Sequence, residues 1–143
     1  MKKPDAATAA AVVLFIVYCL TLAPDVTFWD AGEFITAAHS LGVPHPPGTP
    51  LFVLLANVWG TLLPLKFAVA TNLLSAFSTA LAAYVTGRLV QRGTGNRAMA
   101  LASALAAGGM STAWYNATET EVYATSLALA MLLLAAGERA GRD

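Results

Sequence analysis

Charged residues are scarce in this sequence, which separates it from ordinary water-soluble domains. Aspartate, glutamate, lysine and arginine make up 11% of the 143 residues, whereas about a quarter of the residues in a soluble domain are charged. Eight basic and eight acidic residues leave a formal net charge of zero. Because no basic excess is available to bind a phosphate backbone, we expect no nucleic-acid partner.

Cysteine and the common catalytic motifs are also missing. The single cysteine, Cys19, cannot form an intrachain disulfide, so cysteine usage does not indicate the compartment. The chain has no glycine-rich phosphate loop, no cluster at metal-ligand spacing and no motif of an activated nucleophile. The usual sequence evidence for nucleotide-binding, zinc-binding and hydrolytic proteins is therefore absent.

Apolar residues make up 57% of the chain and occur in long runs. The runs cover about 6–23, 51–65, 69–90, 98–115 and 122–137. A helix needs roughly 17 to 25 residues to span a bilayer. The first run follows Lys2 and Lys3, as in a signal peptide, but it is long for a signal core and lacks a clear cleavage site. We interpret it as a retained membrane anchor.

The basic residues indicate which runs cross the membrane. The 51–65 run would form about 22 Å of helix, whereas the hydrocarbon core is about 30 Å thick. If this run does not cross, seven of the eight basic residues fall on one side, which the positive-inside rule assigns to the cytoplasm: Lys2, Lys3, Arg88, Arg92, Arg97, Arg139 and Arg142. The N-terminus is then cytoplasmic.

We therefore predict an all-α integral membrane protein with four transmembrane helices, at about 6–23, 69–90, 98–115 and 122–137. An outer loop over 24–68 would contain two juxtamembrane helices, at about 28–41 and 51–65. This arrangement gathers most of the carboxylates and both histidines on the outer side: Asp25, Asp30, Glu33, His39, His45, Glu119 and Glu121.

Two of the predicted spans carry rows of small or polar residues. Such rows let helices approach closely in lipid, and we expect them to serve packing alone. The rows are Asn72, Ser75, Thr79, Ala82 and Thr86 in one span, and Ala100, Ala104 and Gly108 in the next.

Asp30 and Glu33 are the first candidates for chemistry. They are three residues apart, so on a helix they share a face. A structural alternative exists for Asp30, because Thr27-x-x-Asp30 has the pattern of a capping box, and Thr118-x-x-Glu121 has the same pattern. Glu33 fits no capping role. His45-Pro46-Pro47-Gly48 predicts a rigid turn, in which His45 either binds a phosphate or is solvated.

Two runs of residues resemble a known family. They are TLAPDVTFWDAGEF at 21–34 and HPPGTPL at 45–51, and EVY at 121–123 is similar to a further signature of the family. They resemble the opening of a bacterial membrane-protein family, formerly a domain of unknown function. That family is similar to the eukaryotic transmembrane O-mannosyltransferase of plexin-type receptors. The resemblance covers most of residues 15–130.

The resemblance implies the N-terminal part of a GT-C glycosyltransferase fold in the bacterial inner membrane. The implied reaction moves a sugar from a polyprenyl-phosphate donor to a hydroxyl of a protein or glycan acceptor on the outer face, with inversion. Asp30 is the implied general base, Glu33 orients the acceptor or the base, and Glu121 and Glu119 line the cleft. The resemblance implies no metal and no other cofactor.

The leaving phosphate needs hydrogen-bonding or cationic partners, for which His45 and Lys66 are the candidates outside the membrane. Members of the family are longer and have more spans, so we expect an N-terminal fragment whose remaining donor site lies downstream. Inactivity of this chain by itself is one alternative. A non-catalytic membrane scaffold and a transporter fragment are the others, and the lack of charge in mid-span argues against the transporter.

Overall fold

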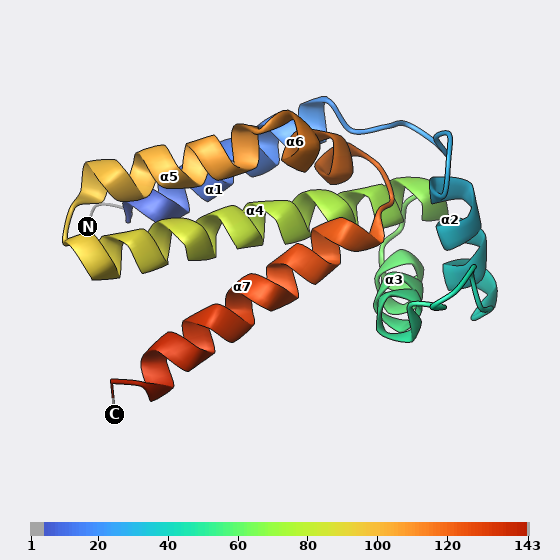
Figure 1. Ribbon diagram of the computed structural model, residues 1–143. Coiled ribbons are helices and arrows are strands. Elements are labelled where there is room, and N and C mark those ends of the chain that lie inside the picture. Colours follow the sequence, from blue (N-terminus) through green and yellow to red (C-terminus); the bar gives the residue numbers. More distant parts are fainter. Residues whose placement is uncertain (1–4, 143) are drawn as a thin grey trace.

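The computed structural model describes residues 5–142, and every regular element in that range is an α-helix. The helical fold class predicted from the sequence is therefore confirmed. Figure 1 shows the helices, which are α1 (Ala6–Leu20), α2 (Ala31–Ser40), α3 (Pro50–Leu62), α4 (Phe67–Thr94), α5 (Arg97–Gly109), α6 (Ser111–Thr118) and α7 (Val122–Ala140).

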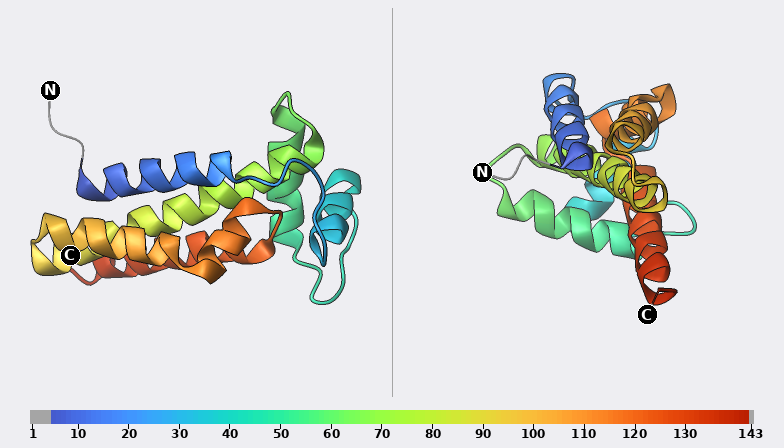
Figure 2. Two further views of the ribbon diagram at one scale, coloured as in Figure 1. Left: turned by 90° about the horizontal axis from the view of Figure 1, so that it is seen from above. Right: turned by 90° about the vertical axis from the view of Figure 1, so that its left-hand side faces the viewer.

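Helix α4 is the centre of a bundle. Helices α1 and α5 lie along it, and α7 starts beside it and diverges towards its own C-terminal end (Figures 1 and 2). In their most apolar stretches, 72% of the α4 residues are buried against 17% of the α7 residues. Among the described helices, α4 and α7 are the two that are long and apolar enough to cross a membrane.

Glycines allow the close approach of the bundle helices. A Cβ atom on Gly87 of α4 would lie 2.9 Å from the Ala100 carbonyl oxygen of α5 and 2.9 Å from the Ala7 Cβ of α1. On α5, the Gly108 carbonyl accepts a 2.6 Å hydrogen bond from the buried Tyr18 hydroxyl of α1. The predicted row of small residues on α5 is buried throughout, so its packing role is confirmed.

Helices α2 and α3 pack across one end of this bundle (Figure 1). Their contact with α4 is a cluster of apolar residues, Phe34, Ala38, Phe52, Ala56 and Leu74. Helix α3 lies across that end and does not run along the bundle.

Several predicted boundaries need correction. The predicted span 98–115 is two helices, because α5 ends at Gly109, Met110 is extended and α6 begins at Ser111. Two successive glycines, which are weak helix formers, precede this break. The predicted span 6–23 is helical only to Leu20, so α1 has 15 residues and is no longer than the helix predicted at 51–65.

The two helices of the outer loop are also shorter than predicted. Helix α2 begins at Ala31 rather than 28, because Trp29 has a left-handed backbone (φ 63°) that no α-helix continues. Helix α3 ends at Leu62 rather than 65, just before Pro64.

The arginines lie at the end of the bundle opposite α2 and α3, on the last two turns of α4, at the start of α5, and on or just after the last turn of α7. Two of them pair with carboxylates of other segments: Arg88 with Asp5, which precedes α1, at 2.8 Å, and Arg92 with Glu138 of α7 at 3.0 Å. Lys2 and Lys3, on which the predicted cytoplasmic N-terminus also depends, lie outside the described residues.

Candidate functional site

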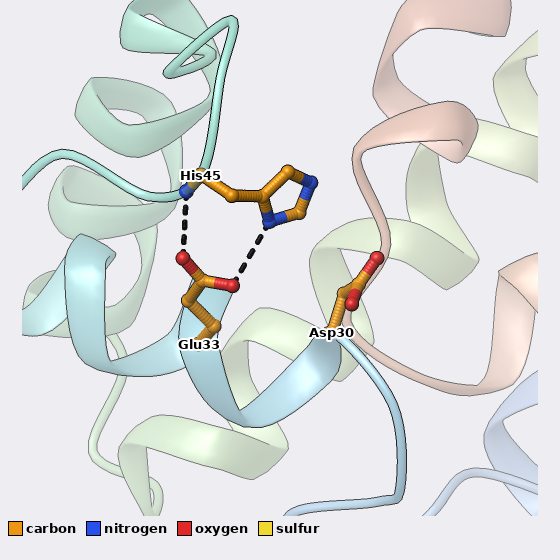
Figure 3. A group of neighbouring side chains, drawn as sticks. All are labelled: Asp30, Glu33 and His45. Atoms are coloured by element: carbon orange, nitrogen blue, oxygen red, sulfur yellow. Dashed lines mark hydrogen bonds and ion pairs between the residues drawn. The ribbon is translucent and has the colours of Figure 1, made fainter.

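Asp30, Glu33 and His45 come together where α2 begins. One possible ligand atom from each residue lies within 4.8 Å of the others, and all three residues are exposed. Figure 3 shows the two carboxylates on the same side of α2, with His45 reaching Glu33 from the loop between α2 and α3. The predicted shared face of Asp30 and Glu33 is therefore confirmed.

Glu33 holds His45 through two hydrogen bonds. The backbone N–H of His45 donates to Glu33 Oε1 at 2.6 Å, and His45 Nδ1 lies 2.9 Å from Glu33 Oε2. The bond from the imidazole lowers the pKa of Glu33, and the same bond raises the pKa of His45. The pair fixes the His-Pro-Pro turn against the first turn of α2.

The sequence pattern placed Thr27 at the start of a helix and Asp30 three residues inside it, but the helix starts only after Asp30. Asp30 immediately precedes α2 and its side chain makes no capping hydrogen bond, while the Thr27 hydroxyl is buried without a hydrogen-bond partner. The capping-box interpretation is therefore wrong. The left-handed Trp29 shortens α2 to Ala31, so Thr27 lies too far back along the chain to cap it. The Asp30 carboxylate stays exposed beside the Glu33–His45 pair.

The second loop, between α6 and α7, places two glutamates in buried positions. Glu119 is 6% exposed and Glu121 is 8% exposed. The capping box predicted here is also wrong, because the Thr118 hydroxyl bonds to Trp114 and Tyr115 carbonyls of its own helix. Glu121 itself precedes α7 without making a side-chain cap, and its Oε2 atom is buried without a partner.

The environment of Glu121 links the two acidic loops. Burial raises its pKa to about 7, and the charges of Glu119 and Asp30 act in the same direction. Asp30 is therefore close enough to repel the ionised Glu121 carboxylate. The structure thus brings acids from the first and second loops to one end of the bundle, with Glu121 partly protonated near neutral pH.

Lys66 lies outside this group. Lys66 immediately precedes α4, and its Nζ atom is 3.4 Å from Asp25 Oδ2 in the loop before α2. Both side chains are largely exposed. The two candidate phosphate partners therefore each have a carboxylate partner already, Asp25 for Lys66 and Glu33 for His45.

The cluster has the donor types of a metal site. Two carboxylates and an imidazole suit Zn²⁺ or Mn²⁺. Both Glu33 oxygens, however, already bond to His45, so a cation would compete with that pair. The absence of a metal remains the expectation that the family resemblance implies.

Several residues that hold the two loops in place were not recognised from the sequence. Asn72, Thr71 and Ser75 of α4 bond to the loops before α2 and before α7, directly or through Thr120. The sequence assigned Asn72 and Ser75 to helix packing. An asparagine within an apolar helix was the available signal, because polar side chains in such helices usually bond to a neighbouring segment.

Comparison with known proteins gives consistent matches. Residues 30–140 match the family described as the Protein O-mannosyl-transferase TMEM260 N-terminal domain. The chain is 41% identical over 123 residues to mouse Protein O-mannosyl-transferase TMEM260, which covers 83% of this chain and 17% of the mouse protein. A protein of the same name from Dictyostelium discoideum is 45% identical over 60 residues, which covers 39% of this chain and 7% of that protein.

No solved structure matches the chain significantly. These matches confirm the resemblance to the O-mannosyltransferase family that the sequence motifs indicated. The chain spans about a sixth of the mouse relative's length, since the match covers 17% of that protein.

Proposed function

The chain belongs to the family of the protein O-mannosyl-transferase TMEM260 N-terminal domain, and on this basis we propose that it forms part of a membrane-bound mannosyltransferase. The proposed donor is a polyprenyl-phosphate sugar, and the acceptor is a hydroxyl of a protein or glycan on the outer face. The fold proposed for the whole protein is GT-C.

In the proposed reaction, Asp30 is the general base. The acceptor oxygen attacks the anomeric carbon with inversion, its proton passes to the Asp30 carboxylate, and the bond to the donor phosphate breaks. A base in this position contributes typically about 10² to 10⁴-fold to the rate. The single observation that carries this assignment is the exposed Asp30 carboxylate, which caps no helix and lies beside both the Glu33–His45 pair and Glu121.

The neighbours of Asp30 have separate roles in this proposal. Glu33 holds His45, whose imidazole is then directed towards a leaving phosphate when protonated. Glu121, partly protonated near pH 7, and Glu119 line the cleft from the second loop. Lys66 contacts Asp25 through one of its three N–H donors, which leaves two donors for a phosphate.

The proposed membrane position follows from the helix arrangement. Helices α4 and α7 cross the bilayer, and α1 and the α5–α6 pair complete four crossings beside them. Helix α3 lies in the outer leaflet, because its outward face is apolar at Leu51, Leu54, Leu55, Val58 and Leu62. The arginine end faces the cytoplasm, and the proposed location is the bacterial inner membrane.

Replacing Asp30 tests the proposal in a full-length member of the family. Asp30→Asn keeps the size of the side chain and removes the base, so mannose transfer should fall by about 10² to 10⁴-fold. The melting temperature should change little, because the side chain makes no capping bond. Transfer is measured with radiolabelled donor.

Thr27→Ala is the matched control. Its hydroxyl has no hydrogen-bond partner, so transfer should be retained. Full turnover of Asp30→Asn would remove Asp30 from the mechanism and leave Glu33 as the remaining candidate base.

A further inference from the structure

The two loops that carry the acids are both bonded to one turn of α4. The Asn72 side chain, which is 1% exposed, donates through Nδ2 to the carbonyl oxygens of Ala23 at 2.9 Å and Asp25 at 3.2 Å. These carbonyls belong to the loop that leads into Asp30.

The other side of the same amide holds the second loop. Asn72 Oδ1 accepts a 2.6 Å hydrogen bond from the hydroxyl of Thr120, which stands between Glu119 and Glu121 and is fully buried. The Thr120 hydroxyl also lies 2.8 Å from that of Thr71. One turn further along α4, Ser75 Oγ accepts the Glu121 backbone N–H at 3.2 Å.

The loops also meet directly, because the Ala23 backbone N–H donates to the Thr118 carbonyl at 2.9 Å. The side-chain nitrogen of Asn72 is therefore bonded to the first loop and its side-chain oxygen to the second. Such a network strongly resists movement, because separating it leaves buried polar groups unpaired.

We propose that Asn72 and Thr120 are positioning residues that fix the distance between the Asp30 and Glu121 carboxylates in the proposed transferase site. The inference rests on the proposed function only for the use of that distance. The alternative is a purely structural role, as at Thr79, whose hydroxyl donates to the Ser75 carbonyl of its own helix.

The first test is the titration of Glu121 in the full chain in lipid nanodiscs, followed by infrared carboxyl bands and assigned with Glu121→Gln. Thr120→Val keeps the side-chain shape and removes the hydroxyl. The loop should then loosen and admit water, so the Glu121 pKa should fall from about 7 towards the ordinary range of a glutamate. Thr120→Ser should keep the wild-type titration, and so should Thr79→Val.

The second test is mannose transfer by the full-length protein. Thr120→Val and Asn72→Ala should lower kcat by about 10- to 100-fold with a smaller change in KM, because misplacing a catalytic group by about 1 Å has an effect of this size. Thr120→Ser, which keeps the hydroxyl, should retain transfer, and Thr79→Val should leave transfer unchanged.

The two measurements separate two kinds of failure. If wild type transfers no mannose, the proposed function fails, while the Glu121 titration still decides whether Asn72 and Thr120 position the loop. Unchanged titration in both Thr120→Val and Asn72→Ala would overturn the positioning role. If those variants do not fold, Ser75→Ala takes their place, because it removes only the acceptor of the Glu121 amide. An unchanged titration in that variant would overturn the proposal equally.

Discussion

At the scale of single residues, the Glu33–His45 pair is the joint between α2 and the proline-rich turn. Its contribution to stability has two limits. The pKa of His45 is raised, so its share is present below the ordinary histidine range and is lost as pH rises through the raised value. The pKa of Glu33 is lowered, so its share is lost only as pH falls through that lowered value. The turn should be most firmly held between these limits.

Glu33→Gln tests the pair. The neutral amide removes the negative partner, so the pKa of His45 should fall towards its ordinary value. The measurement is an NMR titration of the imidazole signals, with His39, the other histidine of the chain, as an internal reference. An unchanged His45 titration would show that the ion pair does not form in solution.

Some of this residue-level detail was predictable and some was not. The spacing of Asp30 and Glu33 predicts their shared face, because three residues make nearly one helical turn. The burial of Glu121 was not predictable, since it depends on the packing of the second loop against α4. The capping patterns at Thr27 and Thr118 misled because a pattern of four residues does not show where a helix begins.

At the scale of helices, the close spacing of α1, α4 and α5 depends on glycines, which have no side chain. Gly87 faces the Ala100 carbonyl and Ala7, which are a backbone atom and a Cβ and cannot rotate away. Dispersion contacts at such close approach replace the hydrophobic effect, which does not favour helix association within lipid. This contact is therefore a sensitive point of the bundle.

Gly87→Ala should destabilise the protein by about 1–3 kcal/mol, as overpacking usually does. Gly93→Ala, in the same helix, is the control, because its new methyl group meets nothing within 4 Å and should be neutral or stabilising by up to about 1 kcal/mol. Unfolding in detergent, followed by circular dichroism, compares the two. Equal stability of both variants would contradict the packing argument.

The sequence predicts the existence of these helices better than their limits. Apolar runs and small-residue rows indicate α1, α4, α5 and α7, because burial and lipid exposure both require apolar side chains. The break at Met110 and the late start of α2 depend on the backbone of one or two residues, which hydropathy does not report. Asn72 was assigned to packing because its partners lie 47 to 49 residues away in the chain.

For the whole molecule, the charges define two ends. Five arginines and two carboxylates, Asp5 and Glu138, lie at the end where α7 finishes. Five carboxylates and Lys66 lie at the α2–α3 end. Both sets were placed on opposite sides from the sequence alone, because charged residues mark the limits of apolar runs. The crossing of α4 and α7 is what would put a membrane between them.

Cysteine labelling tests this orientation in a Cys19→Ala background. Gly93→Cys lies at the arginine end with open space around it, so a membrane-impermeant maleimide should label it only after the cells are permeabilised. Val43→Cys, whose native side chain is 87% exposed on the α2–α3 loop, should be labelled in intact cells. Labelling of Gly93→Cys from outside would reverse or refute the proposed topology.

The separation of charge also makes the protein an electric dipole with no net charge. In the proposed orientation its positive end faces the negative side of an energised membrane. Carrying one unit charge through a potential of 100 mV changes the free energy by about 2.3 kcal/mol. A molecule inserted the other way round would have several charges on the wrong side of that field. The resting voltage of the cell would then act as a continuous orienting force, in addition to any selection made during insertion.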